Sequence, residues 1–424
     1  MTKEKLKQEK NSDKKADKQT ENSGKKFAGK VSVAEKASAK TGDYTTVLSG
    51  SEAIAHGVRL CRPQVCPMYP ITPSTKIPEK ITDFVANGEL DTQLILVESE
   101  HSALSAFIGA SLTGSRTFTA SASQGIALMH EIIPIVSGMR ASGVMAVGNR
   151  TLSSPINIWN DHSDTLSERD QGWIQLYVET CQEALDTIIQ AYKLSETSEI
   201  SLPVMVCLDG FTLTHVFETV KVPAQEKVDK FLPQFKPNDF LDIENPKCFG
   251  GIAFPNSFFE FKESQQIAIQ KALDLIPKIN ADYEKTFSRA YGNGLIELIE
   301  MQDAEIAILG SGTLIGTCRE VVKELRKQGI KAGIIKLKCL RPFPEKDLIE
   351  ATKKLKAIAV LDRHISLGAK GPIFTEVKAL LKEQKILVNG YIAGLGGRDI
   401  TPSHLKQVYS ELKQNKKNEE GWLK

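Results

Sequence analysis

The sequence predicts an α/β protein: a doubly wound, mostly parallel sheet, followed by a second and smaller α/β unit. From Tyr44 onward, short apolar runs of strand length alternate with longer segments in which apolar residues recur at helical spacing. This alternation is typical of parallel sheets whose two faces are covered by helices. It lapses between residues 215 and 300 and resumes at Ala304, which predicts two folded units in one chain.

Composition and charge are those of a soluble globular protein with two or three domains. The 424 residues include 41% apolar and 25% charged residues, and the net charge is +2. Residues 1–42 hold twelve lysines and six acidic residues, which leaves −4 for the rest, so no nucleic-acid surface is expected outside this tail. No apolar run reaches the length of a membrane span, and no signal-peptide core is present, so a cytoplasmic location is expected.

The seven cysteines are scattered, and none stands in a Cys-x-x-Cys pair. They are Cys61, Cys66, Cys181, Cys207, Cys248, Cys318 and Cys339. Such a set is typical of reduced thiols in a cytosolic protein. It argues against an iron–sulfur cluster or structural zinc held by this chain alone, and no metal site is predicted.

In chain order, residues 1–43 are Lys-rich and polar, which predicts a disordered tail. The first unit, 44–250, opens with a helix at Ser49-Gly50-Ser51-Glu52. Its predicted strands are 65–69, 93–97, 117–121, 143–147, 174–178 and 203–208, and 93–97 is expected to be buried. Its other predicted helices are 76–86, 99–112, 125–137 and 182–194.

Residues 251–300 are predicted to be a linker with a connecting helix at 265–276. The second unit, 301–424, is predicted to have helices between its strands, at 306–309, 333–337, 357–361 and 387–392. Gly310-Ser311-Gly312 stands at a predicted helix N-terminus, where it forms either a phosphate-binding loop or a plain tight turn.

The segment Tyr69-Pro70-Ile71-Thr72-Pro73-Ser74-Thr75 follows the first of these strands. Its prolines fix their own φ angles and keep the residues before them out of helical conformations, which predicts a stiff turn presenting three hydroxyls. Such a loop suits a small anion or a planar ligand. The alternative is an ordinary connection in which Ser74 or Thr75 caps the next helix.

Polar residues follow four of the predicted strands. They are Thr72 after the first, Glu98 and Glu100 after the second, residues 121–124 after the third and Arg150 after the fourth. The carboxyl ends of parallel strands meet at one edge of a sheet, where ligands of open α/β sheets bind. We therefore predict a ligand site at this edge.

Each of these polar groups also has a structural interpretation. Glu98 and Glu100 would favour the positive end of the helix dipole, and His101 is expected on the helix surface. Arg150 could hold a carboxylate through two parallel hydrogen bonds, or form a surface ion pair. Three further residues are either metal ligands or members of a polar loop near the site: Asp161, His162 and Asp164.

Four stretches resemble the α subunits of pyruvate:ferredoxin oxidoreductases and related 2-oxoacid:ferredoxin oxidoreductases, within residues 45–405. They are the loop 69–75, Asn157-Ile158-Trp159-Asn160-Asp161-His162-Ser163-Asp164, Gln171-Gly172-Trp173-Ile174-Gln175 and Gly394-Leu395-Gly396-Gly397-Arg398-Asp399-Ile400. The resemblance implies a thiamine diphosphate-binding (pyrimidine-side) domain followed by a transketolase C-terminal-like domain. The glycines of 394–400 are expected to form a tight structural loop.

The resemblance also implies roles for residues of the predicted edge. Glu100 would contact the aminopyrimidine ring of thiamine diphosphate and activate the cofactor. Thr72 and Arg150 would hold the carboxylate of a 2-oxoacid. Further cofactor contacts are expected from Pro70, Ile71, Ser123 and Gln124.

The absence of one motif from this chain bears on which partner subunits are expected. Thiamine diphosphate enzymes hold the diphosphate and Mg²⁺ through Gly-Asp-Gly and a later Asn, and the closest stretch here, Leu208-Asp209-Gly210, lacks the first glycine. The resemblance therefore implies a cofactor shared with a β subunit that holds the Mg²⁺. Iron–sulfur clusters are expected on partner chains (β, γ and δ type subunits), with ferredoxin as electron acceptor, and the chain alone is expected to be inactive.

The implied reaction is the reversible oxidative decarboxylation of pyruvate with CoA to acetyl-CoA and CO₂, with electrons passed to ferredoxin in anaerobic metabolism. The same machinery acting on a branched-chain 2-oxoacid or 2-oxoglutarate is an alternative. Two further alternatives are the β subunit of a lipoamide-linked 2-oxoacid dehydrogenase and a non-catalytic binding module that kept the fold.

Overall fold

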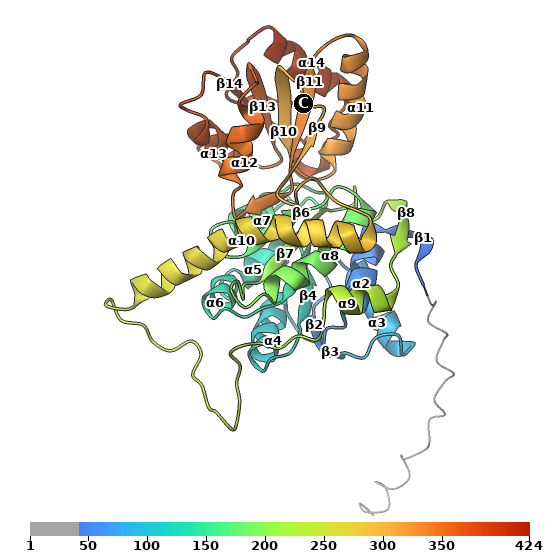
Figure 1. Cartoon of the computed structure of the whole chain (residues 1–424), viewed down its shortest axis with the longest axis vertical. Helices are drawn as coiled ribbons and strands as arrows, with labels where there is room; N and C mark the ends of the chain where they lie inside the picture. Colours follow the sequence, from blue (N-terminus) through green and yellow to red (C-terminus); the bar gives the residue numbers. More distant parts are fainter. Residues whose placement is uncertain (1–41) are drawn as a thin grey trace, which may run out of the picture. The chain divides into compact units, whose positions relative to one another are not determined.

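The structure, a computed structural model, describes residues 42–424 (Figure 1). The predicted tail therefore lies, but for its last two residues, outside the described residues. The described chain contains two main sheets, and the long helix α10 (Phe258–Phe287) lies in sequence between their strands, except that β12, after α10, belongs to the first sheet. No helix between residues 42 and 424 is long and apolar enough to cross a membrane.

The first sheet has the strand order β12-β6-β7-β5-β4, and the parallel pair β2-β3 adjoins β4 through a bridge between Val65 and Thr117. Its neighbouring strands are parallel except β12 and β6, and β1 pairs antiparallel with β8 beside it. The strands are β1 (Tyr44–Ser49), β2 (Val65–Met68), β3 (Gln93–Leu96), β4 (Phe118–Ser121), β5 (Val144–Asn149), β6 (Ile174–Tyr177), β7 (Val204–Asp209), β8 (Phe217–Val222) and β12 (Cys339–Arg341).

The helices of this part lie between those strands in sequence. They are α2 (Gly50–Cys61), α3 (Lys76–Ala86), α4 (Glu100–Leu112), α5 (Ser123–Met129), α6 (Ile133–Gly138), α7 (Ser163–Ser167), α8 (Cys181–Ser195) and α9 (Gln225–Phe231). The predicted start of α2 is confirmed, since the Ser49 backbone N–H donates to Glu52 Oε2 at 2.8 Å in a capping box.

Three predicted elements are wrong in extent or burial. Strand β3 is not buried: in the described chain it pairs only with β2, and Leu96 is 71% exposed. The helix predicted at 125–137 is two helices, because Pro134 in the first turn of α6 cannot continue a helix from α5. The connecting helix predicted at 265–276 is the middle of the 30-residue α10.

The second sheet has the order β15-β14-β13-β10-β11-β9, parallel except for β9 at one edge. Its strands are β9 (Ile296–Ile299), β10 (Ile306–Gly310), β11 (Ala332–Leu337), β13 (Ala357–Asp362), β14 (Leu387–Ile392) and β15 (Gly421–Trp422). Its helices are α11 (Leu314–Lys327), α12 (Glu345–Thr352), α13 (Pro372–Leu380) and α14 (Pro402–Lys413), with a 3₁₀ turn at Leu395–Gly397.

A buried ionic network joins the two parts. Lys336 of β11 donates to Glu179 Oε2 at 2.9 Å and to Glu183 Oε2 at 2.7 Å, and Lys338 donates to Glu183 Oε1 at 2.9 Å. All four side chains are buried. Burial alone would raise the pKa of Glu183, but Lys338 and Lys336 hold it at about 2. The carboxylates of the first part are thus neutralised by cations of the second.

Candidate functional site

The carboxyl-end loops of β2 and β5 meet, as the sequence predicted. The Arg150 guanidinium, just after β5, donates through Nη1 to the backbone carbonyl of Thr72 at 3.1 Å. Pro73 packs beneath this contact: a Cβ added at Gly210 would lie 2.7 Å from Pro73 Cγ. The loop thus rests on glycines at the ends of the central strands, with Thr72 exposed at its tip.

Within the loop 69–75, the Ser74 hydroxyl closes the turn instead of capping the next helix. Buried Ser74 donates to the Ile71 carbonyl at 2.8 Å. Thr75 precedes α3 without a side-chain capping bond. The helix-cap alternative is therefore wrong. Pro70 is exposed and Ile71 is half-buried at the same turn.

Glu100 stands at the first turn of α4 in a confined setting. Its side chain is 6% exposed, yet its carboxylate has no hydrogen-bond or ion-pair partner among residues 42–424. Gly125 leaves the space beside it, because a Cβ there would lie 2.7 Å from Glu100 Oε1 and 2.4 Å from Ser121 Oγ. The Ser121 hydroxyl is also buried without a partner in this part of the chain. The Glu100 carboxylate and the Ser121 hydroxyl are therefore both available to a hydrogen-bonding ligand beside Gly125.

Ser123 and Gln124 begin α5 between Glu100 and Arg150. Ser123 has a φ of +48° and is buried, and its hydroxyl lies 2.7 Å from both the Thr151 carbonyl and Gln124 Oε1, to either of which it can donate. Gln124 is exposed. Contacts therefore run from Glu100 through Gly125 and Ser123 to the loop after Arg150.

Asp164 organises this edge, a role that the sequence did not reveal. Its Oδ2 accepts the backbone N–H groups of Ser123 and Arg150, each at 3.0 Å. Its Oδ1 accepts from Asn149 Nδ2 and the Thr165 N–H, both at 2.8 Å. One buried carboxylate thus ties the start of α5 to the end of β5. The polar run 157–164 was the only local signal, and it does not say which way a side chain points.

Burial raises the pKa of Asp164 from its ordinary value to about 7, against the four N–H donors that favour the anion. An acid with a raised folded-state pKa binds more protons folded than unfolded, so stability falls as pH rises between about 4 and 7. We expect the unfolding free energy of wild type, relative to Asp164→Asn, to fall by up to about 4 kcal/mol over that range. Urea unfolding at pH 5 and 7.5 measures this. The exposed Asp170→Asn is the control, and a flat difference would contradict the prediction.

Asp209, in the stretch that lacks the first glycine, is held by the second part of the chain. The carboxylate accepts the Thr313 N–H at 2.8 Å, Arg363 Nη1 at 2.5 Å and His162 Nε2 at 2.8 Å. Burial would raise the pKa of Asp209, but Arg363 and His162 lower it well below its usual range. The anion at the Gly310-Ser311-Gly312 turn is thus a carboxylate of the same chain, which supports the tight-turn alternative.

The residues weighed as metal ligands each bond to protein groups. Asp161 accepts the Ser163 N–H at 2.9 Å and the Gly396 N–H at 3.3 Å, while His162 bonds to Asp209. No group of three or more His, Cys, Asp or Glu residues in the described range is placed to hold a metal ion. The polar-loop interpretation describes these side chains better. His101, as expected, is half-exposed and pairs with Glu131 at 3.2 Å.

Two of the family-like stretches contact each other directly. The Gly397 N–H donates to the Asn160 carbonyl at 2.7 Å, and Asn157 Nδ2 donates to the Gly396 carbonyl at 3.0 Å. Gly394, Gly396 and Gly397 all have positive φ angles, so the expected tight loop is confirmed. This loop supports the segment whose Asn157 carbonyl accepts from Arg150 Nε at 3.2 Å.

Gly397→Ala should displace Trp159, since the added Cβ would lie 2.3 Å from Trp159 Cβ at a φ of +78°. We expect a loss of about 2–4 kcal/mol in unfolding free energy, from backbone strain and the clash together. Gly368→Ala is a matched control, because Gly368 has a φ of +83° and open space around it. Chemical denaturation and tryptophan fluorescence measure the effect. Equal losses in both variants would contradict it.

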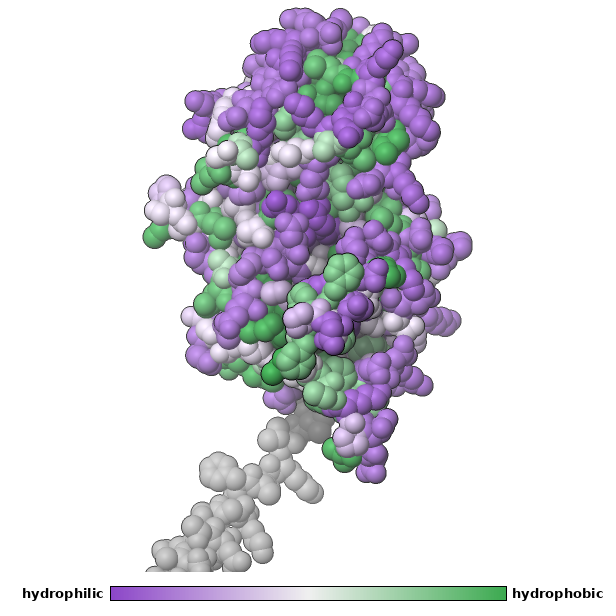
Figure 2. Space-filling model, turned by 90° about the vertical axis from the view of Figure 1, so that its left-hand side faces the viewer, coloured by the Kyte–Doolittle hydropathy of each residue, from purple (hydrophilic) through white to green (hydrophobic). Residues whose placement is uncertain are grey.

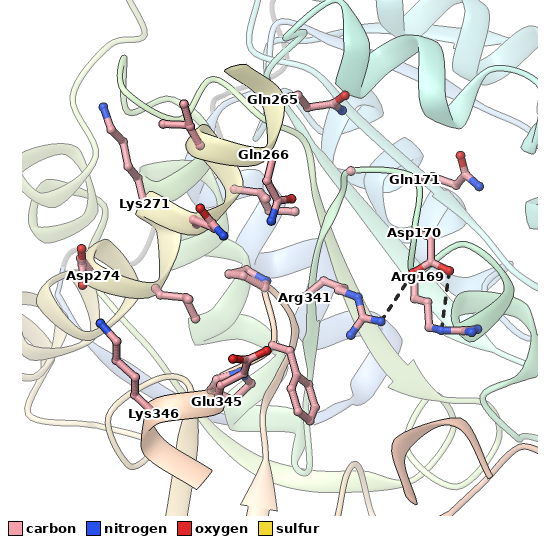
Figure 3. Close-up of a pocket in the computed structure, with 18 of the residues that line it drawn as sticks. Arg169, Asp170, Gln171, Gln265, Gln266, Lys271, Asp274, Arg341, Glu345 and Lys346 are labelled. Carbon is pink, nitrogen blue, oxygen red and sulfur yellow. Dashed lines mark ion pairs between the residues drawn. The ribbon is translucent and has the colours of Figure 1, made fainter. Parts of the chain in front are cut away.

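A cleft of about 950 Å³ lies apart from these residues, between α10, the loop 169–172 and the loop before α12 (Figure 3). Its guanidinium groups are already paired. Arg341 bonds Glu376 at 2.7 Å and lies 3.5 Å from Asp170, and Arg169 lies 3.8 Å from Asp170. None of the predicted site residues lines it.

Comparison with known families identifies two domains. The profile of the pyruvate flavodoxin/ferredoxin oxidoreductase thiamine diphosphate-binding domain matches residues 56–281. The profile of pyruvate:ferredoxin oxidoreductase core domain II matches residues 304–405.

Individual relatives cover nearly the whole chain. The pyruvate synthase subunit PorA of Methanocaldococcus jannaschii is 46% identical, over 89% of this chain and 97% of that protein. In Pyrococcus abyssi, PorA is 48% identical over 87% of this chain and 94% of PorA, and the ketoisovalerate oxidoreductase subunit VorA is 44% identical over 87% and 93%. A solved 2-oxoglutarate:ferredoxin oxidoreductase from Magnetococcus marinus shares the fold, with a TM-score of 0.67 and 19% identity over 87% of this chain and 65% of that one.

Proposed function

This chain belongs to the pyruvate:ferredoxin oxidoreductase family, and we propose that it is the α-type subunit of a pyruvate synthase. The assembled enzyme would convert pyruvate and CoA to acetyl-CoA and CO₂, with electrons passed to ferredoxin. One observation carries the choice of substrate: within Pyrococcus abyssi, the pyruvate synthase subunit is 48% identical and the ketoisovalerate subunit 44%. A branched-chain 2-oxoacid is the second candidate.

The edge around Glu100 fits the pyrimidine side of thiamine diphosphate. When bound, this cofactor supplies the carbanion-stabilising chemistry. The Glu100 carboxylate, which has no partner among residues 42–424, would form a hydrogen bond with the aminopyrimidine ring. The proton held in this hydrogen bond would activate the cofactor. Gly125 gives the ring room, and the Ser121 hydroxyl, with Ser123 and Gln124 at the start of α5, would line it.

The 2-oxoacid carboxylate would bind between Arg150 and Thr72. Arg150 already donates two bonds, to the Asn157 and Thr72 carbonyls, which fixes its guanidinium and leaves three of its five N–H groups without a partner among residues 42–424. A fixed guanidinium with free N–H groups can hold a carboxylate by two parallel bonds. The exposed Thr72 hydroxyl would add a donor, and Pro70 and Ile71 would shape the pocket wall.

The rest of the cofactor is proposed to lie on partner chains. Asp209, whose motif most resembles the diphosphate-binding one, is occupied by Arg363, Thr313 and His162. We therefore assign the diphosphate and Mg²⁺ to a β-type subunit, and the iron–sulfur clusters to partner chains that reduce ferredoxin. Within this chain, 44–250 would be the pyrimidine-side unit and 301–424 the transketolase C-terminal-like unit, joined by 251–300, in a cytoplasmic complex.

Co-purification of the tagged chain with its natural partners tests this proposal. The complex should reduce a viologen dye in the presence of both pyruvate and CoA, and the isolated chain should not. Activity with 2-oxoisovalerate in place of pyruvate would keep the mechanism and change the substrate. Reduction of lipoamide instead of viologen, or thiamine diphosphate binding by the isolated chain, would overturn the proposal.

A further inference from the structure

Three consecutive helices of the first part, α4, α5 and α6, carry few charged residues, although exposed His130 and Glu131 lie between α5 and α6. In α4, charged or ionisable residues occur only at Glu100 and His101, in the first turn, and α5 and α6 have none. Leu128 and Ile135 are nevertheless 49% and 38% exposed on α5 and α6. Surface helices normally carry charged residues on their outer face, and depletion of charge is typical of the core of a protein interface. By contrast, α3 exposes charges along its length.

A second feature adjoins these helices: an apolar arm, defined as residues 241–261, which includes the start of α10. Its exposed apolar side chains are Leu241, Ile243, Ile252, Phe254, Phe258, Phe259 and Phe261. In Figure 2, which faces the side where the arm lies, hydrophobic side chains gather below the centre of the molecule. Exposed aromatic residues in such number are rare on monomeric proteins and are the residues that anchor protein–protein interfaces.

The arm is continuous with these charge-poor helices. The Leu241 N–H donates to the Leu112 carbonyl at the end of α4, at 2.7 Å. Gly250 lies on Met139, which directly follows α6: an added Cβ would be 2.2 Å from Met139 Cε. Figure 1 shows the arm running past α4 and looping back into the start of α10. The helices and the arm therefore form one surface.

The dimensions of this surface indicate which chain covers it. The thirteen residues of α4 span about 20 Å from Glu100 to Leu112, where the arm begins. A standard interface buries about 800 Å² on each partner, a patch roughly 30 Å across. One interface of standard size is therefore large enough to cover both Glu100 and the residues where the arm begins. A second copy of this chain would bring another pyrimidine-side unit to Glu100 and not the missing half of the site.

We propose that the apolar arm and the outer face of α4–α6 bind the subunit that carries the diphosphate-binding half of the site. The four exposed phenylalanines of the arm, Phe254, Phe258, Phe259 and Phe261, insert into an apolar groove of that subunit. The inference rests on the proposed function, because that function requires a second chain at Glu100.

Photo-crosslinking in the native complex tests the contact. p-Benzoylphenylalanine replaces Phe259 in the full chain, and the matched control replaces Leu367, which is 91% exposed in the second part of the chain. We expect position 259 to crosslink to the chain that contains the Gly-Asp-Gly and Asn motif. A crosslink to a second copy of this chain, or no more adduct than at position 367, would overturn the proposal.

Substitution measures the strength of the contact. Phe254→Ser, Phe258→Ser, Phe259→Ser and Phe261→Ser together should weaken association with the diphosphate-carrying chain at least about 100-fold. Leu367→Ser should change it less than about threefold. Far-UV circular dichroism of the variant chain checks its fold, and undiminished association would contradict the proposal. If the complex with p-benzoylphenylalanine at position 259 forms this crosslink but the wild-type complex lacks pyruvate-dependent activity, the proposed function fails and the arm contact stands. An active complex without the crosslink would keep the proposed function and overturn the arm contact.

Discussion

Glu100→Gln in the assembled complex is expected to lower pyruvate- and CoA-dependent viologen reduction by about 10²–10⁴-fold. Glutamine has nearly the shape of glutamate, so the packing against Gly125 is kept while the group that takes the proton is lost. Because the Glu100 carboxylate has no partner among residues 42–424, its removal breaks no ion pair within this range. A loss of turnover would therefore reflect the chemical role of the carboxylate and not a loss of stability.

Glu98→Gln is the matched control, since it makes the same change two residues earlier on an exposed side chain that accepts from the Ser102 hydroxyl at 2.6 Å. It should retain more than half of wild-type turnover. The decisive comparison is the ratio of the two variants at saturating pyruvate. Near-full turnover by Glu100→Gln would remove the assigned role and favour a binding module that kept the fold.

Arg150→Lys is expected to lower kcat/KM for pyruvate by about 10²–10⁴-fold, mostly through KM. Two charge-assisted hydrogen bonds to the substrate carboxylate contribute about 1.5–3 kcal/mol each, and a tenfold change corresponds to about 1.4 kcal/mol. Lysine keeps the positive charge but cannot form two parallel bonds, nor reach both the Asn157 and Thr72 carbonyls.

Arg169→Lys, in the cleft of Figure 3, is the control and should change kcat/KM less than about threefold, because Arg169 pairs with Asp170 and Glu376 away from the site. Steady-state kinetics over a wide pyruvate range separates KM from kcat. An unchanged KM in Arg150→Lys would show that the carboxylate is held elsewhere.

The sequence predicted the central strands well and the edges poorly. β5, β7 and β13 are buried on both faces and read as continuous apolar runs. β12 has three residues and pairs with β6, more than 150 positions earlier in the sequence, so no local sequence pattern predicts this strand. The predicted burial of β3 was wrong for the same reason: exposure depends on which strands flank it.

The candidate site, like the fold, was predicted in part from the sequence. Thr72 and Arg150 were predicted to lie at one edge because each follows a strand of a parallel sheet, and the structure joins them through one hydrogen bond. The part played by Asp164 depends on side-chain direction in an irregular loop, which residue types do not encode. The anion at Gly310-Ser311-Gly312 belongs to Asp209, about a hundred residues away, so the motif alone could not distinguish a ligand from the protein itself.

Buried Lys336 of β11 and Lys338, which follows this strand, limit which parts of the chain can be exchanged with those of a relative. A fragment ending before α10 would leave Glu179 and Glu183 without Lys336 and Lys338, and β6 without β12. An unpaired buried charge costs about 3–5 kcal/mol, a large share of the stability of a typical domain. Chimaeras that exchange the second part with a relative of different substrate preference must therefore carry matched partners for both carboxylates. The two parts of the chain should therefore be exchanged together, although each has its own sheet.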